Sequence, residues 1–248
     1  MSSAPVLRQW QLVTGEIDYC SGARIADFPA EAVILLQSPG PLPACDVCED
    51  SGMTTAPAPR ADQSNVDHVL ARTRHWLETV VIGLNLCPFA KAVHRKNQIR
   101  YVVSSVDSSA DLTIELAREL RLLQEAEPEQ IDTTLLIHPL VLTDFIDYNA
   151  FLGTANRLLR KSGLEGVLQI ASFHPQYAFG DAGADAIENY TNRSPYPMLH
   201  LLREASVARA VDAFPEADAI YEHNMATLQR LGPAGWRRLA VGAEDDTG

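Results

Sequence analysis

Apolar residues recur at spacings of three and four along the chain after Asn65, which predicts an amphipathic helix. The positions that carry this pattern are Val66, Val69, Leu70, Leu77, Val80, Val81 and Leu84. The pattern stops at residues 83–85, and residues 98–106 (QIRYVVSSV) are then rich in β-branched and aromatic side chains. Such a composition is typical of a strand. The main body of the chain therefore begins with a helix followed by a strand.

Two further helix–strand pairs follow, and each has the residues that usually bound such elements. Residues 108–126 and 143–163 have helical periodicity, with serine at the cap of the first helix and glycine at the end of the second. Residues 132–139 and 165–175 are short apolar runs closed by proline, and they predict the second and third strands.

This order of elements predicts an α/β or α+β fold with a helix–β–α–β–α–β core and two C-terminal covering helices, at about 195–213 and 216–231. Strands separated by helices of this length favour right-handed crossovers and a small, mainly parallel sheet. A split βαβ sheet with antiparallel pairs is the main alternative. We expect a single domain over residues 63–240 and an acidic, disordered tail at 241–248.

Residues 1–62 differ in composition from this domain. Their second half is rich in proline, glycine, alanine and serine, which indicates a weakly structured extension. Cys45 and Cys48 form a CxxC pair there, which suits half of a zinc knuckle, a redox pair or an incidental pair in a coil. The sequence from Met53 resembles a natural start, so we expect the residues before it to come from a mis-called reading frame.

Charge and hydropathy narrow the function classes. The net charge of −12 and the pI near 4.9 argue against a nucleic-acid binder, which normally presents a basic face. No apolar run approaches the ~18 residues that span a bilayer, so we expect a cytoplasmic protein without a membrane partner. Four cysteines in 248 residues do not make a disulfide framework.

Two histidines mark the ends of predicted strands. His138 and His174 each follow an apolar run and precede a proline, in LLIHP and ASFHP. If the strands are parallel, both imidazoles reach the edge where open α/β sheets bind ligands. Histidine transfers protons near neutral pH, so the pair suits acid–base chemistry. The alternative is that each histidine bonds a loop at a strand end.

Cys87 precedes a proline where the first helical pattern has to restart. Pro88 suits the first position of a short helix, which predicts Cys87 as its N-cap. The helix dipole would then lower the pKa of the thiol and favour a nucleophile, a redox thiol or a metal ligand. The alternative is a small, buried and inert side chain.

A dense polar group precedes a predicted helix N-terminus at Ser194 and Pro195. Its members are Glu188, Asn189, Tyr190, Asn192 and Arg193. A helix N-terminus preceded by arginine suits an anion such as carboxylate or phosphate. The alternative is a capping network that orders a long loop. The chain has no Gly-rich phosphate loop, HExxH, GxSxG or dinucleotide motif.

Four sequence blocks, in order, resemble a bacterial family known as domain of unknown function 1415. The blocks are VVIGLNLCPFAKAV, DTTLLIHPLVL, LQIASFHPQYAF and ENYTNRSPYPMLHLLREASV. The resemblance covers roughly residues 68–236 and does not reach the N-terminal segment. It implies no activity and no catalytic residues, so the predicted site comes from the residues themselves.

The first of three hypotheses is an enzyme that acts on a small anionic metabolite. Cys87 would be its nucleophile or redox thiol, and His138 or His174 its acid and base. The predicted substrate-binding residues are Asn85, Asn189, Tyr190, Asn192 and Arg193.

The second hypothesis is a mononuclear metal protein, with His138, His174 and either Cys87 or Glu188 as ligands. The third is a non-catalytic module whose polar rim binds a ligand or partner. The sequence assigns no cofactor and leaves the oligomeric state open.

Overall fold

The computed structural model describes residues 63–180, 182–183, 185–213 and 219–242. The predictions for the N-terminal extension, for Cys45 and Cys48 and for the start at Met53 lie outside these residues. Most of the predicted acidic tail lies outside them too.

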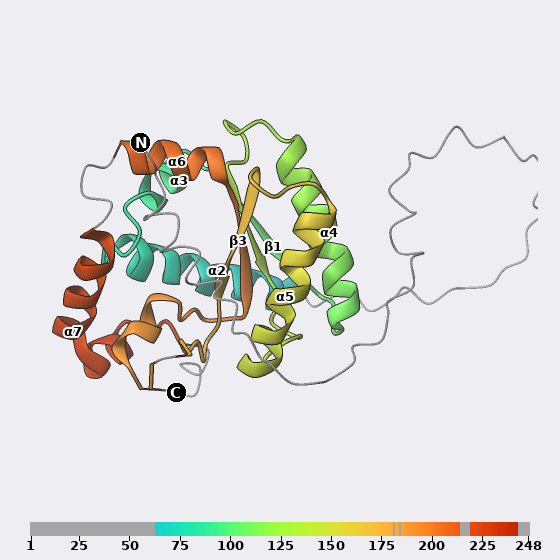
Figure 1. The fold of residues 1–248 in the computed structure, drawn as a ribbon. Helices are drawn as coiled ribbons and strands as arrows, with labels where there is room; N and C mark the ends of the chain where they lie inside the picture. Colours follow the sequence, from blue (N-terminus) through green and yellow to red (C-terminus); the bar gives the residue numbers. More distant parts are fainter. Residues whose placement is uncertain (1–62, 181, 184, 214–218, 243–248) are drawn as a thin grey trace, which may run out of the picture. The chain divides into compact units, whose positions relative to one another are not determined.

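The described chain runs as alternating helices and strands (Figure 1). In order, the elements are α2 (Gln63–Trp76), the π-helix η3 (Leu77–Ile82), α3 (Ala90–Arg95), β1 (Ile99–Val103), α4 (Ser109–Glu125), β2 (Thr133–Ile137), α5 (Phe145–Lys161), β3 (Leu168–Phe173), the 3-10 helix η4 (Ile187–Thr191), β4 (Met198–Arg203), α6 (Glu204–Asp212) and α7 (Ile220–Arg238).

Four strands form one mixed sheet in the order β1-β2-β4-β3. β1 pairs in parallel with β2, in a register that sets Ile99 opposite Thr133. β4 lies between β2 and β3 and is antiparallel to both, so Met198 is opposite Ile137 on one side and Phe173 on the other. The three strands that the sequence predicted therefore point the same way, and the split βαβ alternative describes their arrangement.

The prediction of a helix over residues 195–213 is wrong in its first half. Residues 198–203 form the central strand β4, and α6 begins only at Glu204. Ser194 is not a helix N-cap, because its hydroxyl donates to the carbonyl of Tyr196 at 2.7 Å. The last helix extends beyond the predicted residue 231, across a kink at Gly232 and Pro233.

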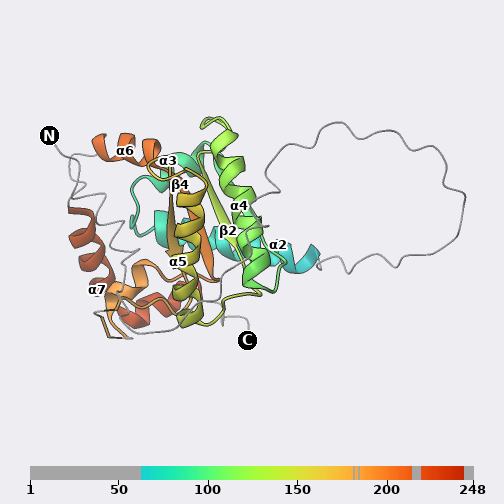
Figure 2. The same ribbon diagram turned by 45° about the vertical axis from the view of Figure 1, so that its right-hand side comes forward.

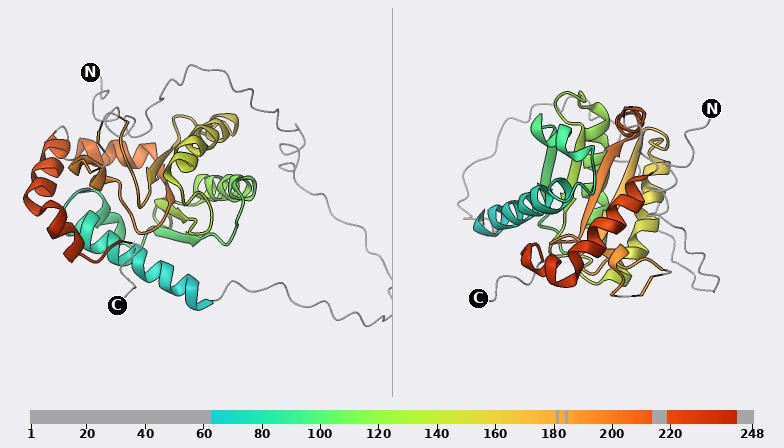
Figure 3. Two further views of the ribbon diagram at one scale, coloured as in Figure 1. Left: turned by 90° about the horizontal axis from the view of Figure 1, so that it is seen from below. Right: turned by 90° about the vertical axis from the view of Figure 1, so that its left-hand side faces the viewer.

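Helices cover both faces of the sheet, as Figures 2 and 3 show. α4 and α5 pack on one face, which we call the α5 face. Their buried residues include Leu112, Leu116, Leu120 and Leu123, the apolar stripe of α4, together with Tyr148, Phe151, Ala155 and Leu159. α2, η3 and α7 pack on the opposite face, which we call the α2 face, where Trp76, Leu77, Val80 and Leu228 are buried.

Local sequence explains where these helices begin and how the first one ends. The Ser108 side chain accepts the amide of Asp111, and the Asp144 side chain accepts the amides of Ile146 and Asp147. α2 continues as the π-helix η3 up to Gly83, where a Cβ atom would collide with the carbonyl oxygen of Thr79. Among the described residues, no helix has the length and apolarity to cross a membrane.

Tyr148→Phe tests the junction of β3 and β4 with α5. The Tyr148 hydroxyl donates to the carbonyl of Met198 at 2.8 Å and accepts the amide of Phe173 at 3.0 Å. Its removal leaves two buried backbone groups without this partner, so we expect a loss of about 1–3 kcal/mol in the free energy of unfolding, measured with urea. The exposed Tyr221→Phe is the control, and an equal loss in both variants would contradict this role.

Candidate functional site

His138 and His174 lie at the same end of the sheet, just after the carboxyl ends of β2 and β3, as the sequence predicted from parallel strands. Each follows the last residue of its strand, and the amide of His138 donates to the carbonyl of Pro197 just before β4. Both rings pack against Tyr148 of α5, with centroid distances of 5.8 Å and 5.0 Å. The two imidazoles are therefore fully buried on the α5 face.

The hydrogen bonds of these histidines fix their tautomers. Nδ1 of His138 lies 2.9 Å from the carbonyl of Val141, which only accepts, so this nitrogen carries the hydrogen. Nε2 of His138 is then a buried acceptor without a partner among the described residues. Both nitrogens of His174 contact backbone, Nδ1 with the amide of Gln176 and Nε2 with the carbonyl of Leu142.

Burial dominates the protonation of both side chains. It lowers the pKa of His138 to about 4, with a further lowering from His174 close by. It also lowers the pKa of His174, against the opposite effect of the Leu142 and Thr143 carbonyls. Both imidazoles are therefore neutral at neutral pH.

Cys87 lies on the α2 face, in the turn between η3 and α3. Its carbonyl accepts the amide of Ala90 at 3.2 Å, and α3 begins at Ala90 with Phe89 as N-cap. The predicted N-cap position of Cys87 is thus wrong by two residues. Burial raises the pKa of the thiol, and the amides of Ala90 and Phe89 oppose this to a lesser extent. The thiol is therefore protonated at rest, opposite to the direction expected from the helix dipole.

The structure does not bring Cys87 together with the two strand-end histidines, because the sheet separates them. Asn85, just before the turn, is exposed and has a φ of 55°, a left-handed conformation that asparagine tolerates. Its predicted role in binding a substrate stays a prediction.

The polar group around η4 orders its own loop. The Asn189 side chain accepts the amide of Phe179 and donates to the carbonyl of Gly183. The side-chain amide of Asn192 donates to the carbonyl of Ser172 at 3.0 Å. The guanidinium of Arg193 stacks over Tyr190, 4.2 Å from the ring centroid. These contacts match the capping-network alternative, and the predicted binding of an anion by these residues stays untested.

The metal hypothesis gains no geometric support from the described part of the chain. No group of three or more histidine, cysteine, aspartate or glutamate side chains lies close enough there to hold an ion. Glu188 lies on η4, where its carbonyl accepts the hydroxyl of Thr191.

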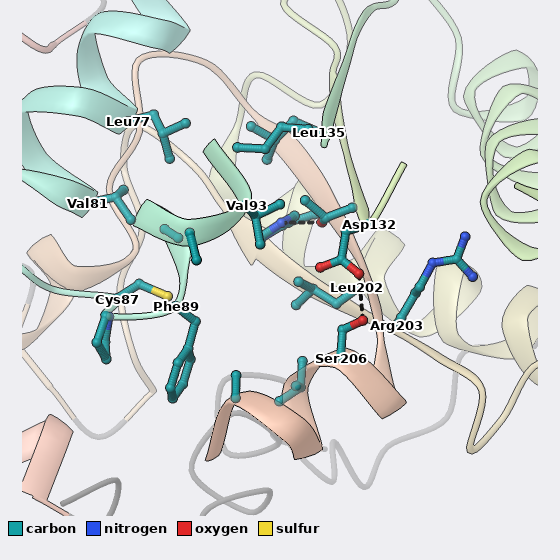
Figure 4. A pocket seen from close by; sticks show the side chains of 18 of the residues that line it. Leu77, Val81, Cys87, Phe89, Val93, Asp132, Leu135, Leu202, Arg203 and Ser206 are labelled. Carbon is teal, nitrogen blue, oxygen red and sulfur yellow. Dashed lines mark hydrogen bonds between the residues drawn. The ribbon is translucent and has the colours of Figure 1, made fainter. Parts of the chain in front are cut away.

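The α2 face contains a pocket of about 360 Å³. Its wall comes from η3, the turn at 87–89, α3, β2, β4 and α6, so segments far apart in the sequence enclose it (Figure 4). Most of the wall is apolar, with Leu77, Val81, Val93, Leu135 and Leu202 among the contributing side chains. Figure 4 shows Cys87 and Phe89 on one side of this pocket and Asp132 with Ser206 on the other.

A few polar side chains interrupt the apolar wall, and most of them already have partners. His200 of β4 lies with Nε2 2.7 Å from the Thr133 hydroxyl. The Ser206 hydroxyl donates to Asp132. Burial lowers the pKa of His200 to about 4, so this ring is neutral as well. His200, and neither His138 nor His174, lines the same pocket as Cys87.

Sequence reasoning missed His200, Asp132 and Ser206 as site residues. The signal for His200 was the run SPYPMLHLLR, in which two prolines favour extended backbone at the preceding residues. A strand at 198–203 alternates its side chains, so His200 must share a face with Met198 and Leu202.

One comparison with known proteins gives a match. A family model described as "Protein of unknown function (DUF1415)" matches residues 68–238, which include every described strand and the pocket. The chain matches none of the curated proteins and none of the solved structures with which it was compared.

Proposed function

This chain belongs to the DUF1415 family of proteins of unknown function, and we propose that its pocket binds a small, predominantly apolar molecule. The observation that carries the proposal is the pocket on the α2 face. Its ≈ 360 Å³ falls within the roughly 300–1,000 Å³ that is usual for ligand sites. Such sites combine an apolar wall with a few polar groups that orient the ligand, as this wall does.

The state of the polar groups favours binding over thiolate chemistry in the resting protein. Cys87 and His200 both line the pocket, but burial and backbone amides account for the shifted pKa of Cys87, and burial alone for that of His200. These shifts favour a neutral thiol and a neutral imidazole over a thiolate–imidazolium pair. An enzyme that uses this pocket would have to activate the thiol after its substrate enters.

A pocket-filling substitution tests the proposal on the full chain. Ala210 of α6 lines the pocket, whereas Ala208 on the same helix is exposed and does not. We expect the neutral apolar dye Nile red to bind saturably, and Ala210→Phe to weaken its binding at least about tenfold, because the phenyl ring occupies the space.

Ala208→Phe is the matched control, since it adds the same side chain to the same helix. Fluorescence titration gives the dissociation constants, and circular dichroism confirms that both variants fold. Equal affinities of the two variants, or no saturable binding by the unaltered chain, would overturn the proposal.

A further inference from the structure

The hydrogen-bonding groups that the pocket leaves open to a ligand are acceptors. The first is Nδ1 of His200. The hydroxyl of Thr133 has one hydrogen and donates it to the carbonyl of Leu201 at 2.6 Å. It must therefore accept from Nε2 of His200, 2.7 Å away, so Nε2 carries the ring hydrogen. In a neutral imidazole, Nδ1 then presents a lone pair.

The second open acceptor is an oxygen of Asp132. Its Oδ1 accepts the Ser206 hydroxyl at 2.5 Å, while Oδ2 has no hydrogen-bond partner among the residues that the structure describes. The Ser206 hydroxyl has no hydrogen left to donate to a ligand, because it donates to Asp132, and its oxygen accepts from Arg209 Nη2 at 2.9 Å. In Figure 4 the Asp132 carboxylate points toward the side of Val93.

The neighbouring cations donate to other groups and not into the pocket. Arg203 extends away from the pocket in Figure 4, and its guanidinium donates to the carbonyls of Leu123, Ala126 and Ile131. Arg209 is held by Ser206 on an exposed part of α6. The remaining polar side chain is the Cys87 thiol, which is only a weak donor.

We infer that the ligand combines an apolar body with a head group that donates hydrogen bonds, an amine or an alcohol, and that this head lies at Asp132 and His200. The inference rests on the proposed function of the pocket. A carboxylate or phosphate head has no hydrogen to donate and repels the Asp132 carboxylate, in a wall too apolar to solvate it. The pocket thus favours the opposite polarity from the anion predicted from the sequence.

Four ligands with the same octyl chain separate body from head: octylamine, octanol, octyl methyl ether and octanoate. Each is titrated by calorimetry into the full chain. The ether accepts hydrogen bonds but cannot donate them, and it measures the contribution of the body alone. We expect the amine and the alcohol to bind at least about tenfold tighter than the ether, and octanoate to bind weakest. The order of the amine and the alcohol decides between a cationic and a neutral head.

Asp132→Asn assigns the preference to one side chain. It removes the charge and one acceptor, so we expect octylamine to lose about tenfold in affinity while the ether is unchanged. Asp212→Asn removes the same charge from an exposed position on α6 and is expected to change neither affinity.

Different outcomes contradict the inferred head group and the proposed pocket function. Octanoate that binds as tightly as octanol or octylamine would overturn the inferred head group. A preference for donors that is undiminished in Asp132→Asn would overturn the assignment to that carboxylate. Failure of all four octyl compounds to bind would overturn the proposed function itself.

Discussion

Lowering the pH from 6.5 to 4 is expected to reduce the free energy of unfolding by about 3 kcal/mol for each of two histidines, His138 and His200. Burial lowers the pKa of His138 and of His200 from 6.5 to about 4. Between these pH values the unfolded chain binds protons that the folded chain rejects. The contribution of the two neutral histidines to stability is therefore complete above pH 6.5. It is lost as the pH falls, by about 1.4 kcal/mol per pH unit for each histidine.

Two substitutions isolate this contribution from that of the carboxylates. His138→Asn keeps a donor for the carbonyl of Val141, and His200→Gln keeps a donor for the hydroxyl of Thr133, but neither replacement titrates. Urea unfolding across this pH range should show a shallower loss of stability in each variant. The exposed His223→Gln is the control. A His138→Asn curve parallel to that of the unaltered protein would contradict a neutral buried imidazole.

The parts of the fold that local chemistry determines could be predicted from the sequence. The cap at Ser108 and the apolar stripe of α4 depend only on residues within one helix, and the structure confirms both. The sequence also predicted that His138 and His174 lie at the same end of the sheet. This followed from the alternation of strands and helices, because helical crossovers make the strands point the same way.

The central strand could not be predicted in this way, because its environment comes from distant segments. Both faces of β4 lie against helices, so its side chains alternate little in polarity, and MLHLLR fits a helix as well as a strand. Pairing with β2 and β3 decides between them. The same pairing places His200 opposite Leu135 and so creates the polar end of the pocket.

The pKa of the Cys87 thiol depends on two competing effects, and the sequence alone does not give their sizes. A helix dipole contributes roughly 0.3–1 kcal/mol, and α3 has only 6 residues. Burial shifts a pKa by up to about 3–5 units in the limit, so even at this partly buried thiol it determines the direction of the shift. The surroundings of the thiol in turn come from tertiary structure, because β2, β4 and α6 line the same pocket as the turn at 87–89.

Trp76→Ala is expected to cost about 3–5 kcal/mol in the free energy of unfolding, a large part of the roughly 5–15 kcal/mol of a typical domain. Trp76 is only 2% exposed and joins α2 to the sheet. Its ring meets Phe173 edge-on at a centroid distance of 5.3 Å, and its Nε1 donates to the carbonyl of Arg193 at 2.9 Å. The loss comprises a cavity beside the pocket and a backbone acceptor that loses this donor.

Two further variants separate these causes. Trp76→Phe keeps most of the packing and removes the indole donor, so we expect it to lose about 1–3 kcal/mol. Trp236→Ala removes a tryptophan that is only partly buried, against Tyr190, and it should cost less than Trp76→Ala. Equal losses from the two alanine substitutions in guanidinium unfolding would show that Trp76 does not anchor the α2 face. Because Trp76 also lines the pocket, the alanine variant should accept bulkier apolar ligands than the unaltered chain wherever it remains folded.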